Sequence, residues 1–292
     1  MAMPPLGYKR LILALPPGAS SVDLRVAAEF ARLLQLEMVA IMLDDFGLAD
    51  PGRLPFTREF RGPLSGWQPI DAERIRRDLE TAAQNLQRSI EAATRDLETN
   101  ARFEVVRGSL GETLRAMADG GDILVLAEPS NPAERASAQF NWLTEAVLGS
   151  QTAVLLVPAR IARTGGPVVA IAAAADDPSI HAAADIAIAC TDELVIIDAD
   201  HIEHGSAVRD LGGDERLRVT RMAAARGNFP DPALLSHAFR HLQERLVVMT
   251  RGSFDDSVAS TIASARHVPV LLIAPPPPEA QGETGPDEHI RR

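Results

Sequence analysis

The first half of the chain alternates short apolar runs with stretches whose apolar residues recur at helical spacing. The runs predict strands that are buried on both faces, and the stretches between them predict amphipathic helices. The expected strands are 10–16, 37–45, 103–108, 122–129 and 152–158, and the expected helices are 20–36, 71–99, 110–120 and 141–148.

A Pro- and Gly-rich insert, 46–70, precedes the longest helix. We expect it to be a lid or contact surface, because its aromatic side chains need something to pack on. These aromatic residues are Phe46, Phe56, Phe60 and Trp67.

The second half repeats this order in fewer residues. Its expected strands are 167–175, 193–200, 217–222 and 245–252, its expected helices are 178–190 and 231–244, and a closing helix and strand share 256–273. Only 201–213 stands where the first half has its longest helix. The chain therefore carries one structural unit twice.

Strands that alternate with helices predict an α/β protein with a parallel sheet covered on both faces. Five strands in each half predict two tandem doubly wound domains, each with the strand order 3-2-1-4-5. We place the first domain at 1–160, the second at 166–275 and a disordered Pro-rich tail at 276–292.

In doubly wound sheets a ligand binds beyond the C-terminal ends of the strands, where the strand order reverses. This switch point lies between the first and fourth strands of each half, beside the loops 16–21, 128–141, 173–179 and 250–257. Candidate binding residues in these loops are Pro16, Gly18, Ser20, Ser130, Asn141, Asp176, Gly252, Ser253 and Ser257. Asp44, at the end of the second strand, could bind a ribose hydroxyl or be a solvated strand end.

The composition narrows the range of functions. A net charge of −11 disfavours binding to nucleic acids. Cys190 is the only cysteine, which excludes an intramolecular disulfide and a Cys-rich zinc site and fits a reducing compartment. Lys9 is the only lysine, so the Gly-Lys-Ser/Thr of a P-loop is absent. With no signal peptide and no apolar run of about 18 residues, we expect a cytoplasmic protein without membrane contact.

Patterns typical of metal sites and enzymes are weak. His237 and His241 are spaced to share a helix face, but Ala238 stands where zinc hydrolases have a glutamate. The first half has no histidine to activate a serine, and no G-x-S-x-G motif occurs. We therefore expect no metal and no catalysis. For the alternative of a small-molecule enzyme on the same fold, the candidate carboxylates are Asp176, Asp177, Asp255 and Asp256.

The closing runs TAVLLVP (152–158) and DSVASTIASARHVPVLLI (256–273) carry a resemblance to the universal stress protein family in its tandem form. The resemblance spans about 8–158 and 167–275 and implies an adenine nucleotide alpha hydrolase-like fold. In that family the last strands of two domains pair with each other. The resemblance thus implies that Thr152–Val157 pairs with Val270–Ile273 as an internal pseudo-dimer, in which each copy covers the other's apolar edge. A further homodimer remains open.

The ATP-binding branch of that family has the motif G-x-x-G-x9-G-[ST] after the fourth strand, and this chain departs from it. In the first half Glu128 and Pro129 occupy the turn, and no glycine follows before the expected helix. In the second half Gly252 is kept, but Asp256 replaces the last glycine before Ser257. A carboxylate repels phosphate, and proline lacks an N–H to donate.

The branch also has an Asp at the end of the first strand. Here the first half has Pro16 and Pro17, and the second half has Ala173 and Ala174. We therefore expect a non-enzymatic stress-response or regulatory module with a degenerate nucleotide site and no cofactor, acting through a protein partner or a small ligand. The alternative is a sensor that binds ATP or AMP through a non-standard loop in one half.

Overall fold

The computed structural model describes residues 7–15, 21–44, 58–60, 62, 66–69, 71–95, 97, 99–107, 113–114, 116, 118–198, 217–223, 239 and 241–274. The first half contains β1 (Arg10–Leu15), α1 (Ser21–Leu33), β2 (Glu37–Asp44), β3 (Arg58–Phe60), β4 (Trp67–Pro69), α2 (Ala72–Arg95), β5 (Ala101–Arg107), β6 (Asp122–Ala127), α4 (Pro132–Arg135), α5 (Ala138–Leu148) and β7 (Ala153–Val157). The second half contains β8 (Val168–Ala172), α6 (Pro178–Cys190), β9 (Leu194–Asp198), β10 (Val219–Ala223), β11 (Leu246–Thr250), α9 (Asp256–Arg266) and β12 (Val270–Ile273).

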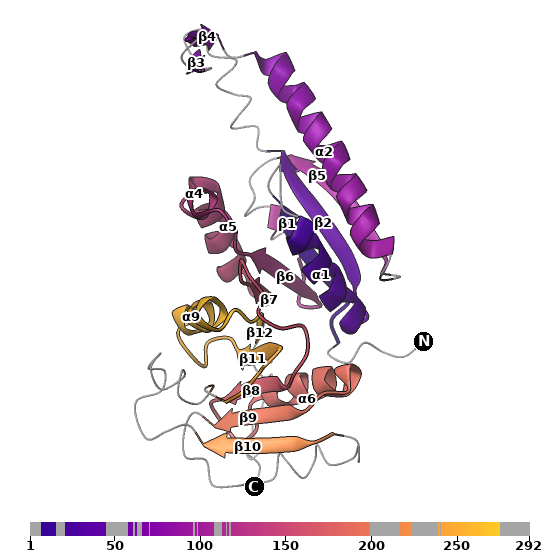
Figure 1. Cartoon of the computed structure of the whole chain (residues 1–292), viewed down its shortest axis with the longest axis vertical. Helices are drawn as coiled ribbons and strands as arrows, with labels where there is room; N and C mark the ends of the chain where they lie inside the picture. The colour runs from indigo at the N-terminus through magenta and orange to yellow at the C-terminus, as the bar shows by residue number, and fades with distance from the viewer. Residues whose placement is uncertain are drawn as a thin grey trace, which may run out of the picture.

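All strands except β3 and β4 form one ten-stranded sheet (Figure 1). Its order is β10-β9-β8-β11-β12-β7-β6-β1-β2-β5. Counted within each half, both five-stranded parts follow the order 3-2-1-4-5 with parallel neighbours. The predicted fold class is therefore confirmed. The boundaries proposed for two separate domains remain a prediction.

The two halves join through their last strands. β12 pairs with β7 in antiparallel register, with Leu271 opposite Leu155 and Val270 opposite Leu156. Every residue of both strands is buried. The expected pairing of Thr152–Val157 with Val270–Ile273 is thus present inside one chain, and neither apolar strand is left as an open edge.

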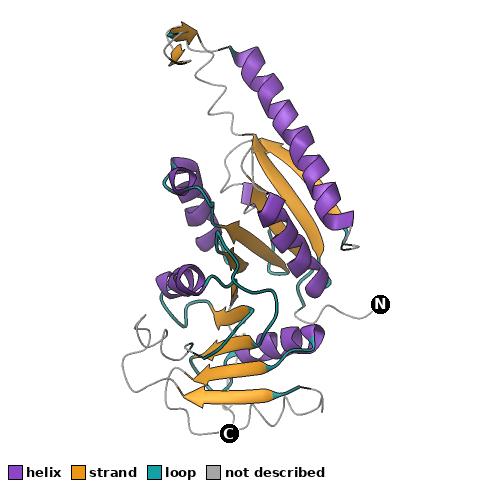
Figure 2. Cartoon of the chain, viewed as in Figure 1, coloured by secondary structure: helices purple, strands orange, loops and turns teal. Residues whose placement is uncertain are grey.

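Helices cover both faces of the sheet (Figure 2). α1, α2 and α6 lie on one face, where residues such as Ala27, Ile90 and Ile186 enter a common core with alternate strand residues. α5 and α9 lie on the other face, where Val147 and Ile262 enter a second core. Since strand side chains alternate between faces, each strand contributes to both cores.

Three helix and loop predictions need correction. α5 begins at Ala138 and not at residue 141, because Ser137 accepts a hydrogen bond from the Phe140 N–H (3.2 Å) and caps the helix. The stretch before it, expected to be a loop, contains the short helix α4. The helix expected over 231–244 does not include its last residues, since Phe239 lies in a turn and 241–244 are not helical. Arg266 instead donates to the carbonyls of Phe239 and Leu242.

The insert contains a small hairpin, β3–β4, beyond the outer end of α2 (Figure 1). Phe60 and Trp67 stack at its surface with ring centroids 5.6 Å apart. They remain 57% and 64% exposed, so within the described residues they pack on each other and not on the sheet. Phe46 and Phe56 lie outside the described residues.

Two buried carboxylates are each paired with an arginine. Asp122 binds Arg10 with both oxygens at 2.8 and 2.6 Å, and Glu244 binds Arg266 with both oxygens at 2.8 and 3.1 Å. Planar guanidinium groups suit such two-point pairing better than the single ammonium group of lysine.

Candidate functional site

Asp177 lies at the switch point of the second half, between the ends of β8 and β11. Its carboxylate is only 3% exposed and accepts hydrogen bonds from the Ala173 N–H (2.9 Å), the Ser179 N–H (2.9 Å) and the Thr250 hydroxyl (2.5 Å). Thr250 is the last residue of β11, so this bond ties the fourth strand to the turn that follows the first. The Asp177–Thr250 hydrogen bond therefore lies at the switch point, where a ligand is expected in doubly wound sheets.

The N-terminus of α6 is closed by the same carboxylate. Helix N-termini bind anions because their first N–H groups are free and the helix dipole is positive there. Here Asp177 is the N-cap and supplies the anion, while the Ser179 hydroxyl donates to the Ile171 carbonyl (3.2 Å). Asp176, the residue predicted for this loop, is exposed beside the cap.

The turn after β11 contains the other predicted residues of the second half. Gly252 has φ +77°, a conformation that favours glycine, although a Cβ there would meet nothing within 4 Å. Gly252, Ser253 and Ser257 are all exposed. Asp255 caps α9 by accepting from the Ser257 N–H (2.8 Å). Hydrogen bonds from the Ser257 side chain and backbone lower the pKa of Asp255 and keep it ionised. A second negative charge thus occupies a helix N-terminus.

Arg251 begins this turn and extends into the first half of the chain. Its guanidinium donates to the carbonyls of Ser150 (2.7 Å), Thr152 (2.8 Å) and Leu148. These carbonyls lie at the C-terminal end of α5 and in the link to β7, where a positive charge is favourable. The Arg251 side chain therefore binds across the junction between the two halves.

The corresponding turn of the first half is longer and begins with Glu128. Its carboxylate binds Arg135 of α4 (2.8 Å) and accepts from the Ala159 N–H (3.4 Å). Asn131 caps α4 through the Ala133 N–H. Ser130 is exposed beside it, and Asn141 lies exposed about one turn inside α5. Neither predicted residue is at a free helix N-terminus.

Of the remaining predicted residues, only Asp44 lies in the described part of the chain. Pro16, Gly18 and Ser20 lie outside the described residues. Asp44 is the last residue of β2 and pairs in register with Arg107 of β5. Its counterpart in the second half, Asp198 at the end of β9, binds Arg221 through both oxygens at 2.6 Å. The acidic end of that second strand therefore has a structural role.

Metal-binding groups do not gather in the described part of the chain. No cluster of three or more His, Cys, Asp or Glu suited to a metal is found among those residues. His241 is exposed, while His237, which was expected to share its helix face, lies outside them.

Thr250 and Arg251 were missed as determinants of this region. The only sequence signal was their position, directly after the fourth strand of the second half, where the expected motif would begin. Their partners, Asp177 and the α5 carbonyls, lie 73 or more residues away in the sequence and give no local pattern.

No protein-family model matches this sequence, and no curated protein matches it. Among solved structures, a universal stress protein from Archaeoglobus fulgidus DSM 4304 is similar, with a TM-score of 0.56 and 13% identity over 90% of this chain and 95% of that one. A functionally unknown protein from Pseudomonas aeruginosa PAO1 aligns with a TM-score of 0.49 and 18% identity over 93% of this chain and 94% of that one. The first likeness establishes that this chain has the fold of a universal stress protein. Within the described part of the chain, no helix is long and apolar enough to cross a bilayer.

Proposed function

We propose that this protein is a cytoplasmic universal stress protein that acts as a non-enzymatic regulatory module, with a nucleotide site that has degenerated into structural contacts. The observation that carries the proposal is the hydrogen bond from Thr250 to Asp177 across the switch point of the second half. It joins the two strand ends between which a nucleotide would lie in this fold.

Electrostatics supports the same conclusion. The carboxylates of Asp177 and Asp255 occupy the N-termini of α6 and α9. A phosphate placed beside either carboxylate is repelled, and this repulsion opposes the attraction of the helix N-terminus. The charges at these two helix N-termini therefore disfavour a triphosphate.

In the first half, the described turn after β6 offers few donors to a phosphate. Glu128 begins the turn after β6, and Pro129 has no N–H to donate. The N–H groups at the start of α5 are partly used by the Ser137 cap. Regulation through a protein partner, without nucleotide chemistry, is consistent with these features.

The alternative of an ATP- or AMP-binding sensor has one observation in its favour. Gly252 adopts a positive φ in an exposed turn directly after the fourth strand, as a phosphate loop would require. In that reading the neighbouring N–H groups of 252–254 would bind phosphate. The direction of the Arg251 guanidinium, toward the α5 carbonyls, argues against it.

The test is to denature freshly purified protein, identify released small molecules by mass spectrometry, and titrate ATP and AMP into the ligand-free protein by calorimetry. We expect no adenine nucleotide, no heat of binding and no phosphate release from ATP above buffer. An ATP-binding universal stress protein serves as the positive control. Co-purified nucleotide, or binding that is lost on Gly252→Val, would establish the sensor instead.

A further inference from the structure

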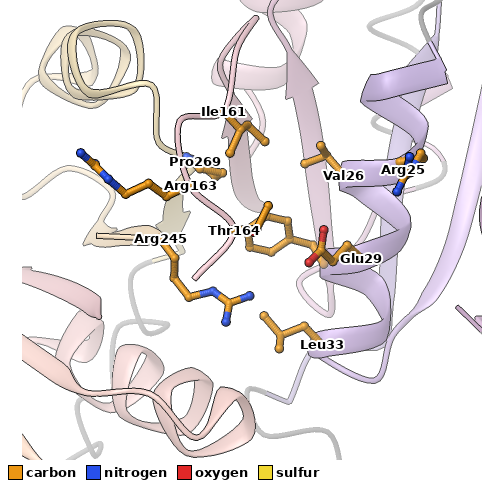
Figure 3. Close-up of a pocket in the computed structure, with 10 residues that line it drawn as sticks. Arg25, Val26, Glu29, Leu33, Ile161, Arg163, Thr164, Arg245 and Pro269 are labelled. Carbon is orange, nitrogen blue, oxygen red and sulfur yellow. The ribbon is translucent and has the colours of Figure 1, made fainter. Parts of the chain in front are cut away.

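A cavity of about 270 Å³ lies between the two halves of the molecule, away from both switch points. One wall is α1, a second is the linker that follows β7, and a third is formed by residues directly before β11 and β12 (Figure 3). Ligand pockets in proteins span about 300–1,000 Å³, so this cavity suits a small metabolite.

The cavity is mostly apolar. Val26, Phe30 and Leu33 line it from α1, and Ile161 and Pro269 line it from the other walls. A ligand that fills it therefore needs an apolar body, because a fully polar molecule would lose water without regaining its hydrogen bonds.

Two charged side chains face each other across this apolar lining. Figure 3 shows the Arg245 guanidinium and the Glu29 carboxylate extending toward the same space from opposite walls. Arg245 uses one nitrogen to bind Asp192 (2.7 Å), which fixes the guanidinium and leaves its other N–H donors available. Among the described residues, no ion pair within 4.0 Å involves Glu29, so the two charges are separated and not joined.

The remaining arginines of the lining do not change this arrangement. Arg163 directs its guanidinium away from the Glu29–Arg245 gap (Figure 3), and Arg25 is exposed on α1. The gap therefore presents one negative and one positive group. A ligand complementary to it carries an ammonium and a carboxylate on an apolar body.

We propose that this cavity binds an α-amino acid with an apolar side chain. Its ammonium group binds Glu29, its carboxylate binds Arg245, and its side chain packs on Val26 and Ile161. Since the walls come from both halves, the bound amino acid stabilises their contact and gives the protein a ligand input independent of a nucleotide site.

The experiment titrates L-leucine into the full-length protein by calorimetry, with N-acetyl-L-leucine and L-leucinamide as analogues that each lack one charge. We expect L-leucine to bind and each analogue to bind about tenfold more weakly or worse, since each loses a charge-assisted hydrogen bond. L-aspartate, which places a third charge on the apolar lining, should bind more weakly still.

Two variants locate the site. Glu29→Gln removes the carboxylate and should lower the affinity for L-leucine about tenfold or more. Val26→Trp fills the cavity and should abolish binding of L-leucine. Glu145→Gln, on the exposed surface of α5, is the matched control and should bind like the unchanged protein. Circular dichroism confirms that each variant is folded. No heat with L-leucine, or binding unchanged by both Glu29→Gln and Val26→Trp, overturns the proposal.

Discussion

The two turns that follow the fourth strands have the same backbone position but opposite side-chain roles. Glu128 and Arg251 each donate their N–H to the carbonyl of the last residue of the neighbouring fifth strand, Val157 or Ile273. The Glu128 side chain stays within its own half and binds Arg135. The Arg251 side chain crosses the junction and binds carbonyls at the end of α5.

This difference shows what duplication in one chain permits. In two identical subunits both turns would carry the same residue. Here one turn has become a contact between the halves while the other has lengthened to include α4. Two turns at equivalent places in the same topology can therefore carry different side-chain contacts.

The two halves are joined by the pairing of β7 with β12, so disrupting this pairing should have the largest effect on stability. Leu271→Asp places an unpaired charge on β12 at a position that is 1% exposed. We expect it to lower the free energy of unfolding by about 3–5 kcal/mol. Urea denaturation followed by circular dichroism measures this. Leu271→Met is the size-matched control and should cost less than about 1.5 kcal/mol. Equal stability of the two variants would show that the β7–β12 contact is dispensable.

Asp177 should be the next most important residue, because it joins the strand ends at the switch point of the second half. Asp177→Ala leaves the Ala173 and Ser179 N–H groups and the Thr250 hydroxyl without their acceptor, and should lower the free energy of unfolding by about 2–3 kcal/mol. Asp176→Ala, at the exposed neighbouring position, should change it by less than about 0.5 kcal/mol. If both variants lose the same free energy of unfolding, the hydrogen bonds of Asp177 do not stabilise the switch point.

Arg251 tests whether its turn stabilises the junction. Arg251→Ala removes three charge-assisted hydrogen bonds and should lower the free energy of unfolding by about 2 kcal/mol. Arg251→Lys should lose less of the free energy of unfolding than Arg251→Ala but should not reach the value of the unchanged protein. A single ammonium group cannot bind separate carbonyls as a planar guanidinium does. The same urea titration applies, with Arg160→Ala in the exposed linker as the control. A neutral Arg251→Ala would remove the functional difference between the two turns.

Glu128 should contribute much less to stability than Arg251. Its partner Arg135 has 41% of its side chain exposed, so solvent screens the pair. We expect Glu128→Gln to change the free energy of unfolding by at most about 0.5 kcal/mol. A loss as large as that of Arg251→Ala would mean that both turns stabilise the molecule equally.

Cys190, the last residue of α6, reports on opening of the second half. Burial raises the pKa of its thiol from the ordinary 9.0 to about 11. The rate of alkylation by iodoacetamide should therefore rise with a midpoint near pH 11. Because the neutral thiol is favoured in the folded state, its contribution to stability is complete below pH 9 and is lost as the pH rises toward 11. A midpoint near 9 would show that α6 opens before the reagent reacts.

Much of the fold could be predicted because its signals are local. The bounds of α6 match the expected helix 178–190, since Asp177 and Pro178 give a clear start and Thr191 with φ +58° gives an end. The β7–β12 pairing was expected from the resemblance to the universal stress protein family, in which the last strands of two domains pair. The predicted start of α5, residue 141, is three residues too late because the prediction leaves out the cap at Ser137. A serine before an apolar run is an ordinary signal for the start of a helix.

The candidate site was less predictable because its contacts are distant in sequence. The Thr250–Asp177 bond and the Arg251 contacts with α5 depend on the three-dimensional arrangement of the strands. The same holds for Glu29 and Arg245, which line one cavity only when the two halves are in contact. The β3–β4 hairpin was missed since its strands have three residues each and no buried face to give a pattern.

The order in which the strands are made has a consequence for synthesis on the ribosome. β7 is complete at Val157, but β12, which covers it, begins only at Val270. At about 5–20 residues per second, an apolar strand edge stays uncovered for about 6–23 s in every nascent chain. During that interval it can pair with a neighbouring nascent chain. The yield of correctly assembled protein therefore depends on translation speed across 158–269 as well as on the stability of the finished sheet.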